Sequence, residues 1–467
     1  MRGYALFLLF ALLTGAERQL AAQKKPSANE NPSAPVKIET THPEPQTNTG
    51  TPKLTLKDAL KRARALSPSV QQAVTNAKIA AEQPTQSREI NLPTVSSNSQ
   101  YLYTQGNGTT AARYIANNGV HEYIAQVDVH QSLSLVSVIQ YRKSVVAAAL
   151  SKDQTEIAQR GLMVAVVAGY AGLVADNHKL ANLRQATQAA QSFAKTTEQL
   201  EAGGEVARAD VVKARIQYAN SQVALEDAQL ADDTARAALA MMVFRNVDQP
   251  YEVVDEPAQT LKLPAFEELQ SETRHENPSL DVALKGEQMA SQAVDAAKAG
   301  YLPTMTLDYF YGIDANHFAT ETPSSPRLDP ELNGRPIQNL GYSALASLTL
   351  PIWNWGATRS KIKSAEALKH EAVQDREFAE RKLVVDLRQF YGEAKMAEVE
   401  MKIRESAVAD AEESRKLTLL QYKSGDATAL EVVSAEDALT QEQNALADAQ
   451  TRYAIALANL ATLTGTL

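Results

Sequence analysis

An internal duplication constrains this 467-residue chain more than any other feature. The segment Ala65–Val70, ALSPSV, matches His275–Leu280, HENPSL, and Gly204 in a later GGE run matches Gly425 in an SGD run. The offset between the copies only grows along the chain, so the order of the elements is kept. The chain is therefore one module written twice, and any fold must repeat its architecture.

Each copy has the same predicted layout. A helix comes first (roughly 56–82 and 280–299), followed by two strand candidates, a very long helix, a tight turn and a return helix. In the second copy the stretch from Thr358 to Lys423 has no proline and one glycine, Gly392. As a helix rising about 1.5 Å per residue it would be roughly 100 Å long, which no compact domain needs.

Three of the four strand candidates alternate apolar and polar residues at period two. The segment 301–313 is the clearest, and 121–135 and 340–352 alternate likewise, whereas 92–104 is mostly Ser, Asn and Gln. Strands of this length can cross a membrane in a β-barrel, and half-buried strands of a soluble sheet are the alternative. Tyrosines near the strand ends, with Trp353 and Trp355, favour the aromatic girdle of a membrane barrel.

Four strands cannot close a membrane barrel, because an open edge in lipid would leave backbone groups without hydrogen bonds. Eight strands is the smallest usual number, so the chain must associate with copies of itself. Two copies would supply eight strands and three would supply twelve. The long helices are rich in Ala with interspersed charges and only a thin apolar stripe, which suits a helical cylinder with water on both sides.

The N-terminus predicts export. Residues 1–22 combine one positive charge, an apolar run at 4–13 and small residues, the pattern of a cleaved signal peptide, with a short buried helix as the alternative. Residues 23–53 contain six prolines and few apolar residues, and predict a disordered linker. Beyond the signal no run approaches eighteen apolar residues, so no membrane-spanning helix is expected.

Composition argues against several functions. The net charge of −9 and the absence of a basic stripe argue against nucleic acid as a partner. The chain has no cysteine, and its seven histidines are scattered without a zinc motif. No nucleophile elbow or phosphate-binding loop occurs, so we expect no enzyme activity, no metal site and no cofactor.

Two similar stretches connect the long helices with their return helices: QLEAGGEVARADVVKARIQ at 199–217 and QYKSGDATALEVVSAEDAL at 421–439. Together with the duplicated layout, the strand-to-helix junction LTLPIWNWGATRSKIKSAEA and the terminal LANLATLTGTL, they give a specific resemblance. From about residue 54 to residue 467, the chain resembles the TolC-type outer-membrane efflux proteins, the outer membrane factor family.

The resemblance implies an α+β membrane protein. It would be a homotrimer whose twelve-stranded outer-membrane β-barrel, with four strands from each protomer, continues into a long periplasmic α-helical barrel. The function implied is a passive exit duct for small molecules or proteins in a tripartite efflux or type I secretion system. The partners implied are outer-membrane lipid, a periplasmic adaptor (membrane fusion) protein and an inner-membrane pump of the RND or ABC type.

The resemblance also implies a periplasmic gate at the two helix-hairpin tips. Tyr422 matches the family's tip tyrosine, and Glu431 and Asp210 match acids that follow the tip glycines, but Ala427 stands where the family has a basic residue. A lock of identical construction is therefore not expected. The gate residues implied are Asp210, Tyr422, Asp426 and Glu431, and the adaptor-docking tips are Gly203, Gly204, Glu205, Ser424, Gly425 and Ala427.

A second interpretation of the tips stays open. Gly425 suits the end of a helix, and Thr428 with Glu431 forms the S/T-x-x-E pattern of a capping box. Capping and gating are compatible. Acids repeated around a narrow mouth would also favour cations over anions.

The predicted organisation has five parts. They are a signal peptide (1–22), a linker (23–53), repeat 1 (54–246, tip 201–209), a connector (247–264) and repeat 2 (265–467, tip 424–428). The Pro-rich stretch 314–336 is expected to be an extracellular loop.

The main alternative function is a secreted or periplasmic coiled-coil scaffold or adhesin without a pore, although such a protein has no use for alternating strands at matching places in both copies. A periplasmic adaptor would need a lipoyl-like domain, which does not occur between the repeats.

Overall fold

The computed structural model describes residues 52–103, 121–255, 263, 265–315, 328–329, 335–336 and 340–465. The predicted signal peptide, nearly all of the predicted linker and most of the 314–336 loop lie outside these residues. The described residues belong to one compact unit, Thr51–Leu467.

The two copies contain helices of matched length. In each copy the four helices have 11, 22, 68 and 36 residues in chain order. At about 1.5 Å per residue the longest pair spans roughly 100 Å. The helices of the first copy are α2 (Leu56–Leu66), α3 (Pro68–Glu89), α4 (Leu135–Ala202) and α5 (Arg208–Val243), and those of the second are α6 (Phe266–Glu276), α7 (Pro278–Ala299), α8 (Ala357–Ser424) and α9 (Ala429–Thr464).

The helix expected at 56–82 is divided into two, and in the second copy an additional helix, α6, precedes the one expected at 280–299. In the first copy α2 ends at Leu66 and α3 begins at Pro68, with Ser67 between them. Proline disfavours the helical conformation in the residue before it but suits the first turn of a new helix. The Ser67 hydroxyl accepts a hydrogen bond from the Val70 N–H over 3.4 Å and so caps α3. Asn277 caps α7 before Pro278 in the same way.

Four long strands form one antiparallel sheet in the order β2-β3-β5-β8. Its register aligns the alternating residues: Tyr311 pairs with Val127 on one side and with Tyr342 on the other, so one face is largely apolar. Edge strands β2 and β8 each have one partner among the described strands. The strands are β2 (Thr94–Tyr103), β3 (His121–Leu133), β5 (Thr304–Ala315) and β8 (Leu340–Thr349), and the two-residue strands pair as β1 (Lys53–Leu54) with β4 (Glu252–Val253) and β6 (Leu328–Asp329) with β7 (Arg335–Pro336).

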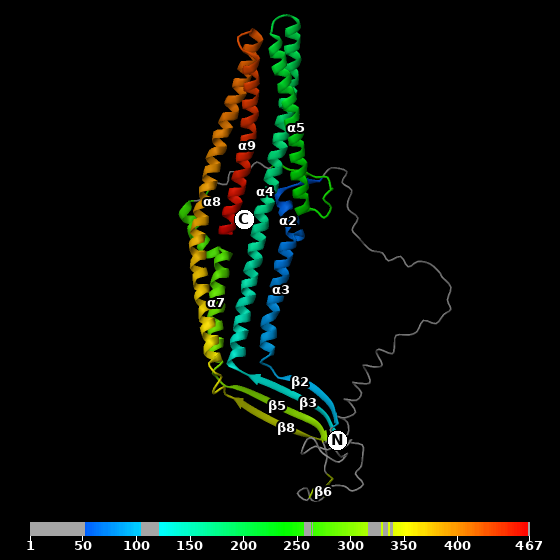
Figure 1. Cartoon of the computed structure of the whole chain (residues 1–467), viewed down its shortest axis with the longest axis vertical. Coiled ribbons are helices and arrows are strands. Elements are labelled where there is room, and N and C mark those ends of the chain that lie inside the picture. The colour runs from blue at the N-terminus through cyan, green and yellow to red at the C-terminus, as the bar shows by residue number, and fades with distance from the viewer. Residues whose placement is uncertain are drawn as a thin grey trace, which may run out of the picture. The chain divides into compact units, whose positions relative to one another are not determined.

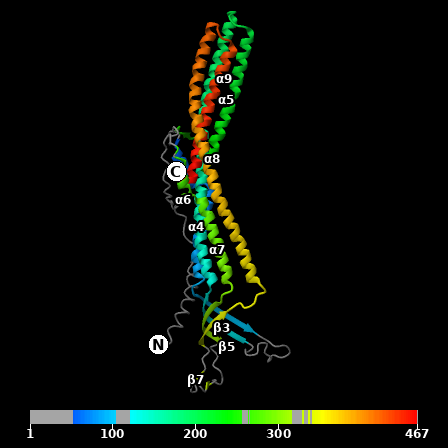
Figure 2. The same cartoon turned by 90° about the vertical axis from the view of Figure 1, so that its left-hand side faces the viewer.

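Helices and strands follow one lateral order. Near the hairpin tips the main neighbours are α5-α4-α9-α8, and toward the strands they are α3-α4-α7-α8. The strands keep that order, because α3 leads into β2, β3 into α4, α7 into β5 and β8 into α8 (Figures 1 and 2). The protomer is therefore built of laterally extended layers whose outer members, α5 or α3 on one side and α8 on the other, lie at open edges.

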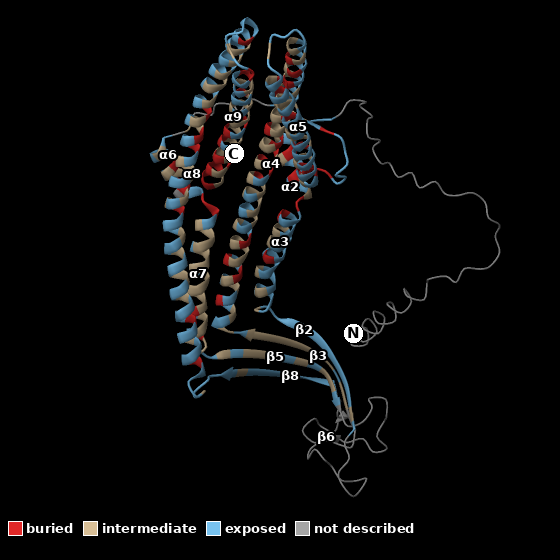
Figure 3. Cartoon of the chain, turned by 45° about the horizontal axis from the view of Figure 1, so that its top comes forward, coloured by how far each residue is buried: buried red, intermediate tan, exposed pale blue. Residues whose placement is uncertain are grey.

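Burial is concentrated midway along the helices, where α2 packs against α4 and α5, while β2 and β8 are almost wholly exposed (Figure 3). Within this core Val166 and Leu173 of α4 are fully buried, and the Tyr170 hydroxyl lies 2.6 Å from the Val254 carbonyl oxygen. Contrary to the expectation from sequence, α4 contains a stretch that is long and apolar enough to cross a membrane by length and composition alone. Of that stretch 28% is buried inside the structure, and a single helix of this kind is weak evidence for a membrane span.

Candidate functional site at the hairpin tips

Both long helices end in the same way. The N–H of Gly204 donates to the Glu201 carbonyl over 2.9 Å, and the N–H of Gly425 donates to the Tyr422 carbonyl over 3.1 Å. Gly204 and Gly425 have φ of 79° and 84°, a left-handed conformation that glycine adopts without steric cost. Gly203 has an ordinary φ of −80° and needs no such freedom.

The return helix of the second hairpin begins with a complete capping box. The Thr428 N–H donates to Glu431 Oε2 over 2.5 Å, and the Glu431 N–H donates to Thr428 Oγ1 over 3.3 Å. The backbone hydrogen bond from Thr428, and then that from its hydroxyl, lower the pKa of Glu431, although the carboxylate is fully exposed. Within the protomer the Glu431 carboxylate is therefore engaged as a helix cap.

The first hairpin lacks this device. Its N-cap residue is Ala207, whose side chain makes no capping bond, and Asp210 lies in the first turn of α5 with Oδ1 3.5 Å from Lys213 Nζ. An acid in the first turn is favourable beside the positive end of the helix dipole. At both tips a left-handed glycine ends the long helix, but only the second return helix begins with a side-chain cap.

Tyr422 is a buried contact between the two hairpins. Its ring lies 5.1 Å from that of Phe193 on α4 in an edge-on arrangement, and its hydroxyl lies 3.4 Å from Thr197 Oγ1. Ala427 packs against the same cluster, so the residue that stands in place of the family's basic residue contributes apolar contact here.

The structure does not bring the predicted gate acids together within one protomer. Each is engaged beside its own tip: Asp210 with Lys213, Asp426 with Ser424 over 2.9 Å, and Glu431 with Thr428. The predicted docking residues are exposed, apart from half-buried Ala427. Among the residues that the structure describes, no group of three or more His, Cys, Asp or Glu is placed to hold a metal ion.

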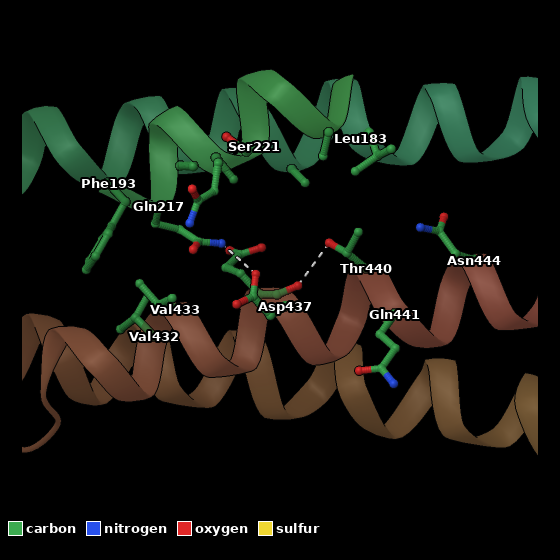
Figure 4. Close-up of a pocket in the computed structure, with 16 residues that line it drawn as sticks. Leu183, Phe193, Gln217, Ser221, Val432, Val433, Asp437, Thr440, Gln441 and Asn444 are labelled. Carbon is green, nitrogen blue, oxygen red and sulfur yellow. Dashed lines mark hydrogen bonds between the residues drawn. The ribbon is translucent and has the colours of Figure 1, made fainter. Parts of the chain in front are cut away.

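The contact that the sequence did not reveal lies about two turns from the tips. Gln217 Nε2 of α5 donates to Asp437 Oδ1 of α9 over 2.5 Å, and so joins the two hairpins directly (Figure 4). The bond crosses a cleft of about 360 Å³ between the hairpins, lined by Phe193, Val432 and a series of amides and hydroxyls. Both residues lie near the ends of the matching stretches 199–217 and 421–439, but neither is part of the glycine and capping pattern of the tips, and they lie in different copies of the repeat.

Further contacts join α4 to α9 at the end of the cleft away from the tips and beyond it. Lys179 Nζ lies 2.6 Å from Asp448 Oδ1, and the Asn182 and Asn444 side chains lie 3.4 Å apart. Together with the Tyr422 cluster and the Gln217–Asp437 bond, these contacts hold the two hairpins side by side along their length.

The outer helices carry apolar residues that the protomer leaves uncovered. On α5, Val223 is 63% and Leu230 is 67% exposed, and Met396 on α8 is 68% exposed. The spacing of seven residues is the heptad repeat of a coiled-coil seam. The stripe on α5 consists of Val212, Ile216, Val223, Leu230 and Met241, and that on the corresponding part of α8 of Met396, Ile403 and Leu417.

Comparison with known proteins agrees with this architecture. Residues 269–466 match the family model described as outer membrane efflux protein. The outer membrane protein TolC of Escherichia coli (strain K12) is 24% identical over 425 residues, which are 88% of this chain and 82% of that protein. The TolC of Vibrio cholerae serotype O1 is 27% identical over 203 residues, which are 43% of this chain and 44% of that protein.

The fold is shared with solved structures. The Campylobacter jejuni CmeC outer membrane channel superposes with a TM-score of 0.76 at 15% identity, covering 95% of this chain and 94% of that one. At this identity the likeness concerns the fold.

Proposed function

We propose that this chain, which is similar to the TolC-type outer-membrane efflux proteins, is an exit channel of the outer membrane that extends into the periplasm, and that it works as a passive trimeric duct gated at its hairpin tips. The protein itself would carry out no chemistry. Energy would come from an inner-membrane pump of the RND or ABC type through a periplasmic adaptor, with small molecules or proteins as cargo.

The observation that carries the proposal is that the sheet and the helix layers of one chain have unpaired outer edges. The described sheet has edge strands β2 and β8, and the helices above it end laterally at α5 and α8. Unpaired strand edges cannot lie in lipid, so the edges must meet the edges of other copies. Three copies would give twelve strands that continue into a ring of twelve helices at each level, with the apolar face of the sheet toward lipid.

The exposed apolar stripes support the same closure. Heptad-spaced residues on α5 and α8 lie at opposite lateral ends of one protomer, so the α5 stripe of one copy can pack against the α8 stripe of the next. Such a contact is heterologous, and it closes into a ring when the rotation between copies is constant.

The gate would lie at the ends of the two hairpins. Tyr422, Asp210, Asp426 and Glu431 lie at or beside the two tips. Separation of the hairpins would break the Tyr422 contact with α4 while leaving the Lys179–Asp448 tie intact. The exposed turn residues around Gly204 and Gly425 would face the adaptor.

Two measurements test the duct. Native mass spectrometry of the purified protein should give a trimer, and planar bilayers should show small, cation-selective openings. The triple variant Tyr422→Phe/Glu431→Ala/Asp210→Ala should widen them. If the variant forms pores of unchanged conductance, these residues do not form the gate, but the duct itself is supported. A folded trimer that forms no pores would overturn the duct and favour the coiled-coil scaffold.

A further inference from the structure

The polar face of the strands carries a hydrogen-bonded histidine–aspartate pair that the gate does not use. His130 of β3 and Asp308 of β5 are paired in the sheet register, and the imidazole Nδ1 donates to Asp308 Oδ1 over 2.5 Å. The His130 side chain is 44% exposed and the Asp308 side chain 17%, so water reaches the pair from the histidine side.

The surroundings of the pair are acidic. Asp128 lies two residues before His130 on the same face of β3, and its Oδ1 is buried without a hydrogen-bond partner. Asp314 lies on the corresponding face of β5. The facing strand β2 offers Thr94 and Ser96, and β8 offers Leu345 and Ser343, none of which titrates. The four long strands contain no Lys or Arg.

This composition has an electrostatic consequence. The polar face includes Asp128, Asp308 and Asp314, and His130 is the one basic side chain among its described residues. A proton on the imidazole would reduce the net negative charge of this face. In a narrow water-filled passage with low-dielectric walls, fixed charges set the local concentration of permeating ions.

We propose that the His130–Asp308 pair is a pH-dependent charge-selectivity element in the lumen of the β-barrel, separate from the hairpin tips. The proposal rests on the proposed duct, in which the polar face of the sheet lines the passage. The barrel prefers cations at alkaline pH, and the preference weakens as the imidazole takes up a proton. The cargo affected would be organic or inorganic cations, which acids attract and imidazolium repels.

The test uses the purified full-length protein in planar bilayers under a KCl gradient. The reversal potential is measured while the pH of one chamber is lowered from 8 to 5, and then that of the other. In the wild type, the K⁺ over Cl⁻ permeability ratio should fall at least about two-fold. It should do so only when the chamber on the barrel side is acidified. In His130→Gln the ratio should not respond to pH, and in Asp308→Asn it should already be lower at pH 8.

His178 provides a matched control. It forms a pair of the same kind, with Nε2 2.8 Å from Asp255 Oδ2, and its side chain is equally exposed at 44%, but it lies on α4 outside the sheet. His178→Gln should keep the full pH response. A wild-type response retained in His130→Gln, or one obtained from the helix side alone, would overturn the proposal. Pore formation reports on the duct itself, so failure of the duct and failure of this pair are distinguishable.

Discussion

Gln217 and Asp437 are bonded to each other over 2.5 Å, although one belongs to the first hairpin and the other to the second. The bond is exposed and crosses the cleft between α5 and α9, close to the buried contact of Tyr422 with α4. The two contacts hold the ends of the hairpins together within one protomer. Opening of the duct by hairpin separation would have to break both.

Removal of the amide should loosen the hairpins. A single hydrogen bond contributes about 1 kcal/mol, so Gln217→Ala should raise the frequency of openings in planar bilayers about five-fold. Gln389→Ala is the matched control, because Gln389 donates to Glu393 over 2.9 Å within one helix. Equal opening frequencies in wild type and Gln217→Ala would show that the bond does not restrain the tips.

Tyr422 should act through packing more than through its hydroxyl. The 3.4 Å separation from Thr197 Oγ1 is long for a bond between hydroxyls, so Tyr422→Phe should cost less than about 0.5 kcal/mol of local stability. Tyr422→Ala removes a buried ring and should cost about 3 kcal/mol. Hydrogen exchange of residues 190–200 measures both. Tyr391→Ala, which removes a similar edge-on contact with Phe266, should leave exchange at the tips unchanged. Equal effects of Tyr422→Phe and Tyr422→Ala would contradict the packing argument.

The first turn of α9 should loosen in acid. Its cap depends on a Glu431 carboxylate whose pKa is lowered in the folded state. A lowered folded-state pKa gives stability that is present above the unfolded-state pKa and is lost as pH falls through the folded-state value. Hydrogen exchange at 428–432, corrected for intrinsic rates, should therefore accelerate as pH falls below the ordinary Glu range. In Glu431→Gln this dependence should vanish.

The start of α5 is an internal control for that experiment, because Ala207 makes no side-chain capping bond. Exchange at 207–211 should lack the acid-dependent step that 428–432 show. A step of the same size at both tips would assign the effect to something other than the Glu431 cap.

The α5 stripe should determine assembly. Val223 is exposed in the protomer, so Val223→Asp should leave the protomer folded while placing a charge in the proposed seam with α8 of the next copy. Native mass spectrometry should show loss of the trimer in favour of smaller species. Gln222→Asp introduces the same carboxylate at the adjacent, exposed position and should remain trimeric. A stable Val223→Asp trimer would place the seam elsewhere.

The α+β class was predictable because repetition and periodicity are properties of the sequence itself. The duplication, the alternation in 301–313 and the proline-free stretch of α8 all point to long helices joined to membrane strands, and the fold comparison confirms that class. The break between α2 and α3 was not predicted, although Ser67 and Pro68 carry its signal, because the helical pattern of apolar residues continues on both sides of them.

The site was less predictable, because its contacts join residues that are distant in sequence. Local rules identified the Thr428–Glu431 box and the two tip glycines. They could not show that Tyr422 packs against Phe193, nor that Gln217 bonds to Asp437, because these pairs depend on the lateral placement of the two hairpins. On long polar helices, the sequence pattern does not distinguish a polar side chain that bonds to a neighbouring helix from one that faces water.

The identical helix lengths in the two copies restrict how this protein can change over evolutionary time. Insertion of one residue into α4 would rotate every later side chain of that helix by about 100° and misplace its contacts with α5, α7 and α9 together. The packing of the helices would be preserved only by insertions or deletions of whole helical turns, or by equal length changes in the helices that pack together. Length variation among relatives should therefore accumulate where helices give way to strands, as in the seven-residue junction 350–356 before α8, which the first copy replaces with Ser134 alone.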